Sequence, residues 1–404
     1  MTSSRHRTRR VLQISTMVLV SALALSACGR GSESSSESSS GSESESLVVA
    51  ATFPQSGPLA VTGATGRGVK AAIDEANTAG GVNGKKVTWV DYDDGYDPAR
   101  MVANARKAVQ QDKANVLVSF GGPSLAIRPF LNQNKVFHVV LAGNTAFSDK
   151  KFPYTHAAFP DIKGESTVMA AAVKKKQPNA VVGVLGFNND LTDSQVAGLT
   201  AGGLKPKLVL KVPPSQQDVT SQITQAKQAG VDTLFMSVSG GQIIGAVKYM
   251  AAIKYSPTVA LYSTTAGKTD AIGALGPAAE GLTTAMWVAD PADPLWAKEA
   301  DVARFKKAIA GSGVEGDADS LLAMLGYLTG QALVASLESA KSTDGDAINA
   351  AWEGIDGVQA AGLPPGTTLS YGAGGRLQHT YQVVRLEGGE WKPQGAAVDT
   401  QASE

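Results

Sequence analysis

Cysteine is nearly absent from this sequence of 404 residues, which contains a single one, Cys28. A lone cysteine cannot close a disulfide within the chain, so everything after it must fold without disulfides and without thiolate chemistry. Histidine is also scarce, and only His138, His156 and His379 follow the N-terminal segment. These three lie far apart in the sequence and lack the spacing of metal-binding histidines, so we expect neither a histidine-based metal site nor a catalytic triad.

No charge of either sign is in excess, because 36 Lys and Arg balance 36 Asp and Glu. Basic residues do not gather in a stripe in the part of the chain that follows the leader. Nucleic-acid binding therefore has no electrostatic support, and we expect no nucleic-acid partner.

Nucleotide and metal motifs are missing as well. The glycine-rich run Gly63–Lys70 lacks the Gly-Lys-Ser/Thr ending of a phosphate-binding loop, and no Gly-x-Gly-x-x-Gly opens a helix. The acidic run Asp91–Asp97 has Tyr96 at its sixth position, where an EF-hand needs glycine, so we interpret it as a strand end, a turn and a helix N-cap. We therefore predict no cofactor and no metal. The absence of Gly-x-Ser-x-Gly leaves an enzyme as the weakest hypothesis.

A basic leader and an apolar run occupy the N-terminus. Four arginines among residues 5–10 precede the run Val11–Ala27, which is shorter than the roughly 20 residues of a membrane-spanning helix. A basic head, an apolar middle and a small-residue end predict a secretory signal peptide over residues 1–27. The pair Arg9-Arg10 is compatible with twin-arginine export as well as with the general secretory route.

The segment Leu25–Gly29 resembles the lipobox of bacterial lipoproteins. This resemblance implies that the Cys28 thiol receives a diacylglycerol and that cleavage leaves Cys28 as the first residue. Residues 31–46 contain only Ser, Glu and Gly, which have little to bury. We therefore expect residues 28–46 to form the lipid anchor and a flexible tether, holding a folded domain at the extracytoplasmic face of the cell membrane.

Residues 47–404 alternate short apolar runs with segments of helical period. Strands are predicted in two serial sets, at 47–51, 87–92, 116–120 and 137–141, then at 181–185, 208–212, 234–238 and 259–263. Helices are predicted between them, including one from about Ser124 and one capped by Asp97, with long helices near 295–310 and 320–340 and a late strand at 380–386. We expect an α/β fold with two open, mostly parallel sheets, a crossing within 155–166, and no second apolar run of membrane-spanning length.

Several segments resemble the type I periplasmic binding proteins, in particular the branch that binds branched-chain amino acids, amides, urea and aromatic acids. The resemblance rests on Ser56–Ala60, Gly68–Asn77, Gly80–Lys86, Asp93-Asp94-x-x-Asp97-Pro98, Gly121–Ser124 and Gly143–Thr145. It covers essentially all of residues 47–398 and is most specific in the N-terminal third.

This resemblance implies two Rossmann-like lobes joined by three crossings, with a ligand cleft between them. Lobe 1 would comprise residues 47–157 and 289–375, lobe 2 residues 158–288 and 376–398, and residues 399–404 a tail. A small solute would be trapped when the lobes close by a hinge motion. The loaded monomer would then dock on an ABC permease, near which the lipid on Cys28 would hold it.

Two hydroxyl residues match the positions where the first lobe of this family binds a ligand carboxylate. Ser124 stands at a predicted strand-to-helix turn, where free N–H groups and the helix dipole favour an anion. A plain N-cap is the alternative role for Ser124. Thr145 follows the next strand and matches the family's second hydroxyl, with Asn144 beside it. The resemblance therefore implies ligand contacts from Ser124, Thr145 and Asn144.

Three expected contacts depart from the pattern of the amino acid binders. Thr62, Thr192 and Gln242 stand where those proteins carry aromatic residues, and they offer hydrogen bonds in place of an apolar wall. They favour a small polar solute, such as an amino acid, an amide or a carboxylate. The alternative is that these residues form the rim and that another aromatic residue, Tyr262 or Phe187, fills the site.

The acid that pairs with a ligand ammonium in the family falls near Thr264. No acid lies between Val259 and Lys268. A buried ammonium without a carboxylate partner is unfavourable, so either Asp190 or Asp193 takes this role or the ligand is not an α-amino acid.

We expect a solute-binding lipoprotein of an ABC importer. The alternative is a receptor of the same fold that presents its ligand to a separate signalling partner.

Overall fold

The computed structural model describes residues 47–400. The described residues all belong to one compact unit. The predicted signal peptide, Cys28 and the tether lie outside the described residues.

The first sheet has five parallel strands in the order β2-β1-β3-β4-β5. They are β1 (Leu47–Phe53), β2 (Val87–Asp93), β3 (Val116–Phe120), β4 (Phe137–Leu141) and β5 (Thr155–Ala157). Every residue of β1 and β4 is buried. A strand buried on both faces reads as a continuous apolar run, which is why these strands could be predicted without an alternating pattern.

The second sheet continues in the order β12-β11-β10-β9-β8-β6-β7. Its strands are β6 (Val182–Phe187), β7 (Leu208–Val212), β8 (Thr233–Ser237), β9 (Thr258–Leu261), β10 (Thr283–Met286), β11 (Thr380–Glu387) and β12 (Glu390–Pro393). β6 to β10 are parallel, whereas β11 and β12 run antiparallel at one edge. The short β13 (Val398–Asp399) pairs with β11.

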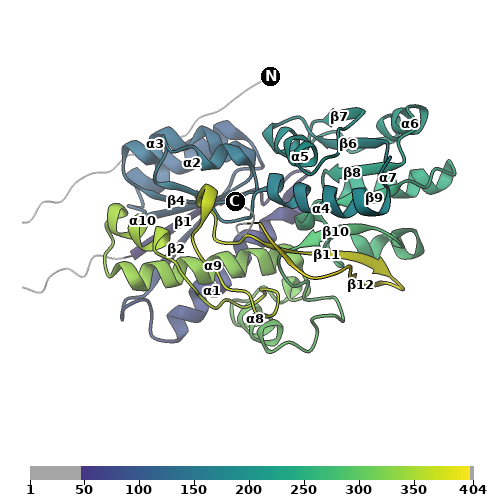
Figure 1. Cartoon of the computed structure of the whole chain (residues 1–404). Coiled ribbons are helices and arrows are strands. Elements are labelled where there is room, and N and C mark those ends of the chain that lie inside the picture. Colours follow the sequence, from purple (N-terminus) through teal and green to yellow (C-terminus); the bar gives the residue numbers. More distant parts are fainter. Residues whose placement is uncertain (1–46, 401–404) are drawn as a thin grey trace, which may run out of the picture. The chain divides into compact units, whose positions relative to one another are not determined.

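Helices cover both sheets, which gives two α/β lobes (Figure 1). The first sheet packs with α1 (Ala64–Thr78), α2 (Pro98–Gln110), α3 (Arg128–Gln133), α8 (Ala300–Gly311), α9 (Leu321–Ala340) and α10 (Gly345–Glu353). The second packs with α4 (Ile162–Lys176), α5 (Asp190–Ala201), α6 (Thr220–Gln228) and α7 (Gly240–Ala252). The chain therefore passes between the lobes three times: after β5, after β10 and before β11.

The three crossings contact one another. The buried Arg376 guanidinium, on the third crossing, donates to the carbonyl oxygens of Ala142, Asn144 and Phe159 at 2.6 to 3.1 Å. The ring of Phe159, on the first crossing, packs on Trp287 of the second, with 5.4 Å between ring centroids. These contacts tie the two lobes together at their hinge.

Helix α9 packs closely along α1, and the two lie side by side in Figure 1. A Cβ atom on Gly326 would come within 1.8 Å of the Thr65 carbonyl oxygen, so only glycine allows this approach. α9 is long and apolar enough to cross a membrane by length and composition, which contradicts the expectation that no second apolar run of that length would occur. Of its apolar window, 78% is buried inside the protein, as in a core helix.

Most predicted elements are confirmed, and 116–120, 137–141 and 208–212 match strands residue for residue. The cap of α2 is also confirmed, because the Asp97 side chain accepts hydrogen bonds from two backbone amides. The helix expected from about Ser124 is present, but as an α-helix it starts later, at Arg128. Ser124 lies inside the 3-10 helix Gly122–Ala126, and its amide is used by the Gly121 carbonyl oxygen at 3.1 Å. The lobe boundaries given above stay a prediction.

Candidate functional site

A cavity of about 380 Å³, called the inner cavity below, lies where strands of both sheets end. Residues at or just after the carboxyl ends of β3, β4, β6, β8 and β9 line it. This is where open parallel sheets bind their ligands, because the loops after several strands converge there. The two lobes contribute opposite walls.

Aromatic and aliphatic side chains form most of the inner cavity wall. The aromatic residues are Tyr96, Phe120, Phe159, Phe187 and Tyr262, and the larger aliphatic ones are Leu59, Val61, Leu141, Leu191, Val238, Ile244 and Leu322. The side chains with hydrogen-bonding groups are Thr62, Asn144, Asn189, Ser237, Ser239, Thr264, Thr265 and Asp270. Among the described residues no lysine, arginine or histidine lines the wall.

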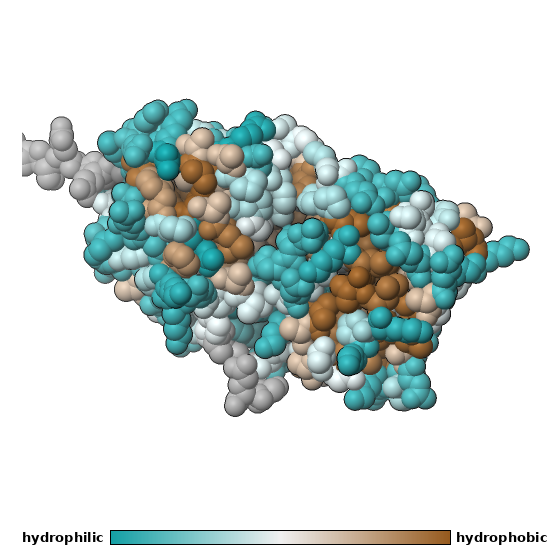
Figure 2. Space-filling model, turned by 90° about the horizontal axis from the view of Figure 1, so that it is seen from above, coloured by the Kyte–Doolittle hydropathy of each residue, from teal (hydrophilic) through white to brown (hydrophobic). Residues whose placement is uncertain are grey.

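The surface around the lobes is more polar than this wall. Figure 2 shows polar residues over much of one face, with apolar areas between them. Few large hydrophobic side chains are strongly exposed, and one of them, Val61 at 49%, lines the inner cavity. An exposed apolar residue at the opening is consistent with a site that takes up an apolar group.

Tyr262 lines the inner cavity, and its hydroxyl group is buried without a hydrogen-bond partner among the described residues. The residue is 6% exposed, and burial raises the pKa of its hydroxyl, while the neighbouring Thr264 side chain opposes the shift. Tyr262 therefore stays a neutral O–H donor. A buried donor without a partner is uncommon and calls for an explanation.

The Tyr262 hydroxyl reaches across to the other lobe at Gly143. A Cβ atom on Gly143 would lie 2.3 Å from the Tyr262 oxygen and 2.8 Å from the Pro160 carbonyl oxygen. Only glycine at this position lets the loops after β4 and β9 meet at the base of the inner cavity.

Asp270 is the one acid on the wall, and the sequence analysis missed it. Its two carboxylate oxygens accept hydrogen bonds from the Ser320 hydroxyl at 2.9 Å and the Leu322 amide at 3.2 Å. Burial raises the pKa of Asp270, while those two hydrogen bonds lower it. Asp270 is the first acidic residue after the segment Val259–Lys268, and this position in the sequence is the signal that could have identified it.

Three of the residues expected from the sequence line the inner cavity: Thr62, Asn144 and Thr264. The Thr62 hydroxyl donates to the Leu59 carbonyl oxygen at 2.7 Å, which leaves its acceptor lone pairs available. The Asn144 amide donates to Asp190 in the other lobe at 2.7 Å. Asn144 therefore joins the two lobes at the edge of the site.

Three others are fully buried behind the wall and do not line the inner cavity. The Ser124 hydroxyl accepts from Ser119 at 2.7 Å, and the Thr192 hydroxyl donates to the Phe187 carbonyl oxygen at 2.6 Å. Gln242 caps α7 with Ser239 and donates to the Gln216 carbonyl oxygen at 2.7 Å. Their polar groups are occupied by the protein itself, so in this structure they support the wall from behind.

Thr145 and the two candidate acids also lie off the inner cavity. The exposed Thr145 donates through its hydroxyl to Asp161 at 3.1 Å. Asp193 forms an ion pair with Lys211 at 2.5 Å. Asp190 lines a second hollow of about 680 Å³, called the outer groove below, and one of its carboxylate oxygens is buried without a partner among the described residues. The outer groove is lined by Pro58, Leu59, Gly95, Tyr96, Pro98, Gly122, Pro123, Leu125, Asn188, Asn189, Asp190, Pro214 and Ser215.

Metal-ligating side chains and a serine–histidine pair were the other candidates for a functional site among residues 47–400. Within residues 47–400, no group of three or more His, Cys, Asp or Glu residues is placed to hold a metal ion. Ser119 and His138 form a hydrogen bond of 2.8 Å, but both are fully buried, and burial lowers the pKa of His138 to about 3. A substrate cannot reach this serine, so the pair is part of the core.

Comparisons with known proteins agree with this geometry. A family model described as periplasmic binding protein matches residues 46–390. The fold is similar to a branched-chain amino acid ABC transporter protein from Thermus thermophilus with bound valine, at 18% identity and a TM-score of 0.79, covering 88% of this chain and 97% of that one. It is also similar to a solute-binding protein from Rhodopseudomonas palustris BisB5 in complex with 3,4-dihydroxybenzoic acid, at 23% identity and a TM-score of 0.74, with the same coverage.

A curated relative, the Leu/Ile/Val-binding protein homolog 2 of Brucella abortus (strain 2308), is 27% identical over 175 residues. The match covers 42% of this chain and 47% of the relative, so it spans about half the length of that protein. The family model covers far more of the chain, from β1 to β11, and includes every residue of the inner cavity. This chain therefore belongs to the periplasmic binding protein family.

Proposed function

We propose that this protein is the extracytoplasmic solute-binding lipoprotein of an ABC importer. It captures one small solute in the inner cavity when its lobes close, as a monomer, and delivers it to a membrane permease. The observation that carries this proposal is a mostly apolar cavity at the strand ends of two lobes, lined by Tyr262, whose buried hydroxyl has no partner among the described residues. The relatives with bound valine and dihydroxybenzoic acid support a solute of this size.

We infer that the solute carries an aromatic or branched aliphatic body. The inner cavity is at the small end of the range of about 300 to 1,000 Å³ for ligand sites, and its wall is mostly rings and aliphatic side chains. The wall therefore favours the alternative in which Tyr262 and Phe187 fill the site over a wall made of hydrogen-bonding groups. Thr62, Asn144 and Thr264 would orient the solute.

The polar end of the solute is an acceptor such as a carboxylate. Tyr262 offers an O–H donor, and the N-terminal residues Gly240 and Gly241 of α7 lie on the same wall. The partial positive charge at a helix N-terminus favours an anionic group. Asp270 supplies the one carboxylate that could face an ammonium, so it separates two classes of solute: amino acids, which need it, and plain aromatic or aliphatic acids, which do not.

A thermal-shift screen of the purified protein tests the proposal. The probes are benzoate, 3,4-dihydroxybenzoate, valine, leucine and phenylalanine. A probe present at 100 times its Kd should stabilise the folded protein by about 2.7 kcal/mol. If none of the five raises the melting temperature, the proposed solute class is wrong.

Asp270→Asn sorts the two classes of solute. The variant should lose binding of amino acids and retain binding of benzoates, because only an ammonium needs the carboxylate. Loss of both by a folded variant would contradict this role.

Uptake separates the importer from the receptor alternative. Deleting the gene should abolish uptake of the labelled solute found in the screen, and a copy on a plasmid should restore it. Unchanged uptake with loss of a transcriptional response to the same solute would favour the receptor.

A further inference from the structure

The outer groove continues from the inner cavity and shares part of its wall. Five residues line both spaces: Pro58, Leu59, Tyr96, Gly122 and Asn189. Among these five, Tyr96 has the only aromatic ring. A large side chain at such a shared boundary can block a ligand in the inner cavity from extending into the outer groove.

Tyr96 has an unusual backbone conformation. Its φ is +64°, in the left-handed region, and it follows Gly95 with a φ of +54°. Bulky residues rarely occupy this region, whereas glycine and asparagine do so readily. A glycine at position 96 would form the same turn without strain, so the turn alone does not explain a tyrosine here. Residues held in strain often serve a site, which directs attention to the ring.

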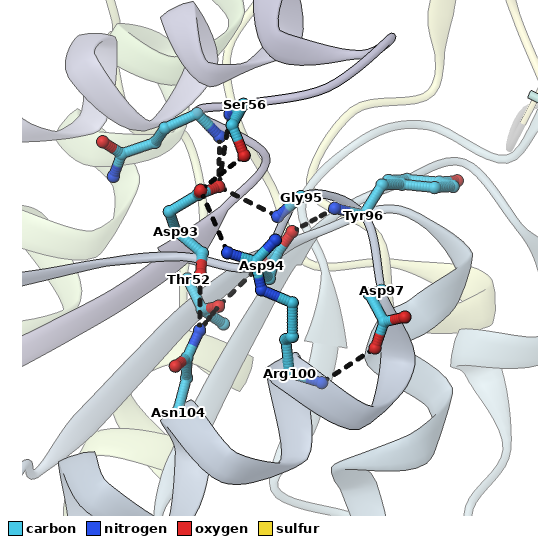
Figure 3. Close-up of polar contacts among 10 residues, drawn as sticks. Thr52, Ser56, Asp93, Asp94, Gly95, Tyr96, Asp97, Arg100 and Asn104 are labelled. Atoms are coloured by element: carbon cyan, nitrogen blue, oxygen red, sulfur yellow. Dashed lines mark hydrogen bonds and ion pairs between the residues drawn. The ribbon is translucent and has the colours of Figure 1, made fainter. Parts of the chain in front are cut away.

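A buried carboxylate holds this strained turn in place (Figure 3). The Asp94 side chain accepts from the Tyr96 amide at 2.7 Å and from the Thr52 hydroxyl of β1 at 2.9 Å, and Asp94 is 0% exposed. Asn104 of α2 donates to the same Thr52 hydroxyl at 3.0 Å. The turn is thus fixed to the strand and the helix beside it.

Asp93 secures the other side of the turn. Its carboxylate accepts from the amides of Gln55, Ser56 and Gly95 at 2.9 to 3.2 Å, and from the Ser56 hydroxyl at 2.6 Å, as Figure 3 shows. The carboxylates of Asp93 and Asp94, in the acidic run Asp91–Asp97, therefore both stabilise one turn through hydrogen bonds. This turn holds the backbone of Tyr96 in a fixed position.

The ring of Tyr96 lies against Gly121 and near Phe120. A Cβ atom on Gly121 would be 2.7 Å from the ring, so the glycine makes room for it. The ring centroids of Tyr96 and Phe120 are 6.3 Å apart. Burial raises the pKa of the Tyr96 hydroxyl to about 12, so the side chain stays neutral in this apolar setting.

From this arrangement we propose that Tyr96 is a specificity-determining residue that closes the inner cavity against the outer groove and so limits the length of the solute. Short acids whose body fits within the inner cavity are accepted, and solutes with a longer apolar extension are rejected by the ring. This inference rests on the proposed function, because it names the size class of the same site.

Tyr96→Gly tests the inference, because glycine adopts the required backbone conformation without strain, which offsets part of the packing lost with the ring. The probes are two homologous series, benzoates and phenylalanines. Each series has three members: the unsubstituted acid, the para-propyl derivative and the para-heptyl derivative. Calorimetric titration of the purified full-length protein gives the affinity ratio of heptyl to unsubstituted probe. We expect this ratio to rise at least tenfold in Tyr96→Gly, and the length limit to persist in Tyr96→Phe, which keeps the ring.

Lys113→Gly is the matched control, because Lys113 is an exposed residue with a φ of +57° that lines neither space. It should relieve backbone strain in the same way and leave the length profile as in the parent protein. The inference would be overturned if folded Tyr96→Gly and the parent protein had the same affinity ratio of heptyl to unsubstituted probe. It would also be overturned if neither protein bound any probe of either series. Binding of a heptyl probe by Tyr96→Gly alone would support it even where the solute class proposed above fails.

Discussion

At the scale of single residues, Tyr262 offers the most direct test of the site. Tyr262→Phe removes only the unpartnered hydroxyl. A hydrogen bond to a charged acceptor contributes about 1.5 to 3 kcal/mol, so a carboxylate solute should bind at least tenfold more weakly. The stability of the empty protein should not fall, because no internal hydrogen bond is lost. Calorimetric titration and thermal melting measure the two effects.

Tyr255→Phe is the control for this change. The Tyr255 hydroxyl donates to the Val231 carbonyl oxygen at 2.7 Å and does not line the inner cavity. Its loss should reduce stability by about 1 kcal/mol and leave solute affinity unchanged. Equal affinities for Tyr262→Phe and the parent protein would mean that the hydroxyl does not contact the solute.

At the scale of elements, a buried acid joins α4 to the loop after β9. Glu165 accepts from the Ser263 amide at 2.8 Å and from the Ser263 hydroxyl at 2.7 Å, and Ser263 lies between the wall residues Tyr262 and Thr264. Among residues 47–400 no cationic group forms an ion pair with this carboxyl group, and burial raises its pKa to about 8, while the two hydrogen bonds from Ser263 lower it. In the folded protein Glu165 therefore holds its proton to a higher pH than in the unfolded chain.

This difference in pKa predicts the direction of a pH effect on stability. The folded state binds more protons than the unfolded state between about pH 4.5 and 8. The contribution of Glu165 to the free energy of unfolding is therefore complete below about pH 4.5 and is lost as pH rises through 8. The slope should reach about 1.4 kcal/mol per pH unit. Glu165→Gln should remove this slope in urea unfolding. The exposed Glu338→Gln should keep it, and an unchanged slope in Glu165→Gln would contradict the assignment.

Elements were more predictable from the sequence than the side chains at their ends. Buried parallel strands such as 116–120 are continuous apolar runs, so their limits could be read directly. The edge strand β5 is only three residues long and gives no periodic signal. The inner cavity is different, because its wall depends on which way each loop residue turns.

Individual site residues illustrate this limit. Thr192 and Gln242 occupy positions that the family resemblance pointed to, yet each turns inward and bonds to nearby backbone or cap groups. Asp270 reaches the wall through a loop whose path no local pattern encodes. Thr62, Asn144 and Thr264 line the cavity as the resemblance suggested, and their role as ligand contacts stays a prediction.

At the scale of the whole molecule, the lipid proposed for Cys28 would determine where the protein works. Cys28 lies outside the described residues, and its role rests on the lipobox-like segment Leu25–Gly29. A single acyl chain gives only reversible membrane binding, whereas the diacylglycerol expected on Cys28 holds the protein stably beside its permease. Cys28→Ala should therefore lose incorporation of radiolabelled palmitate in growing cells, while Ser36→Ala in the tether should keep it. Measuring the label avoids confusion with retention by an uncleaved signal peptide, and label on Cys28→Ala would show that the lipid is attached elsewhere or that no lipobox is used.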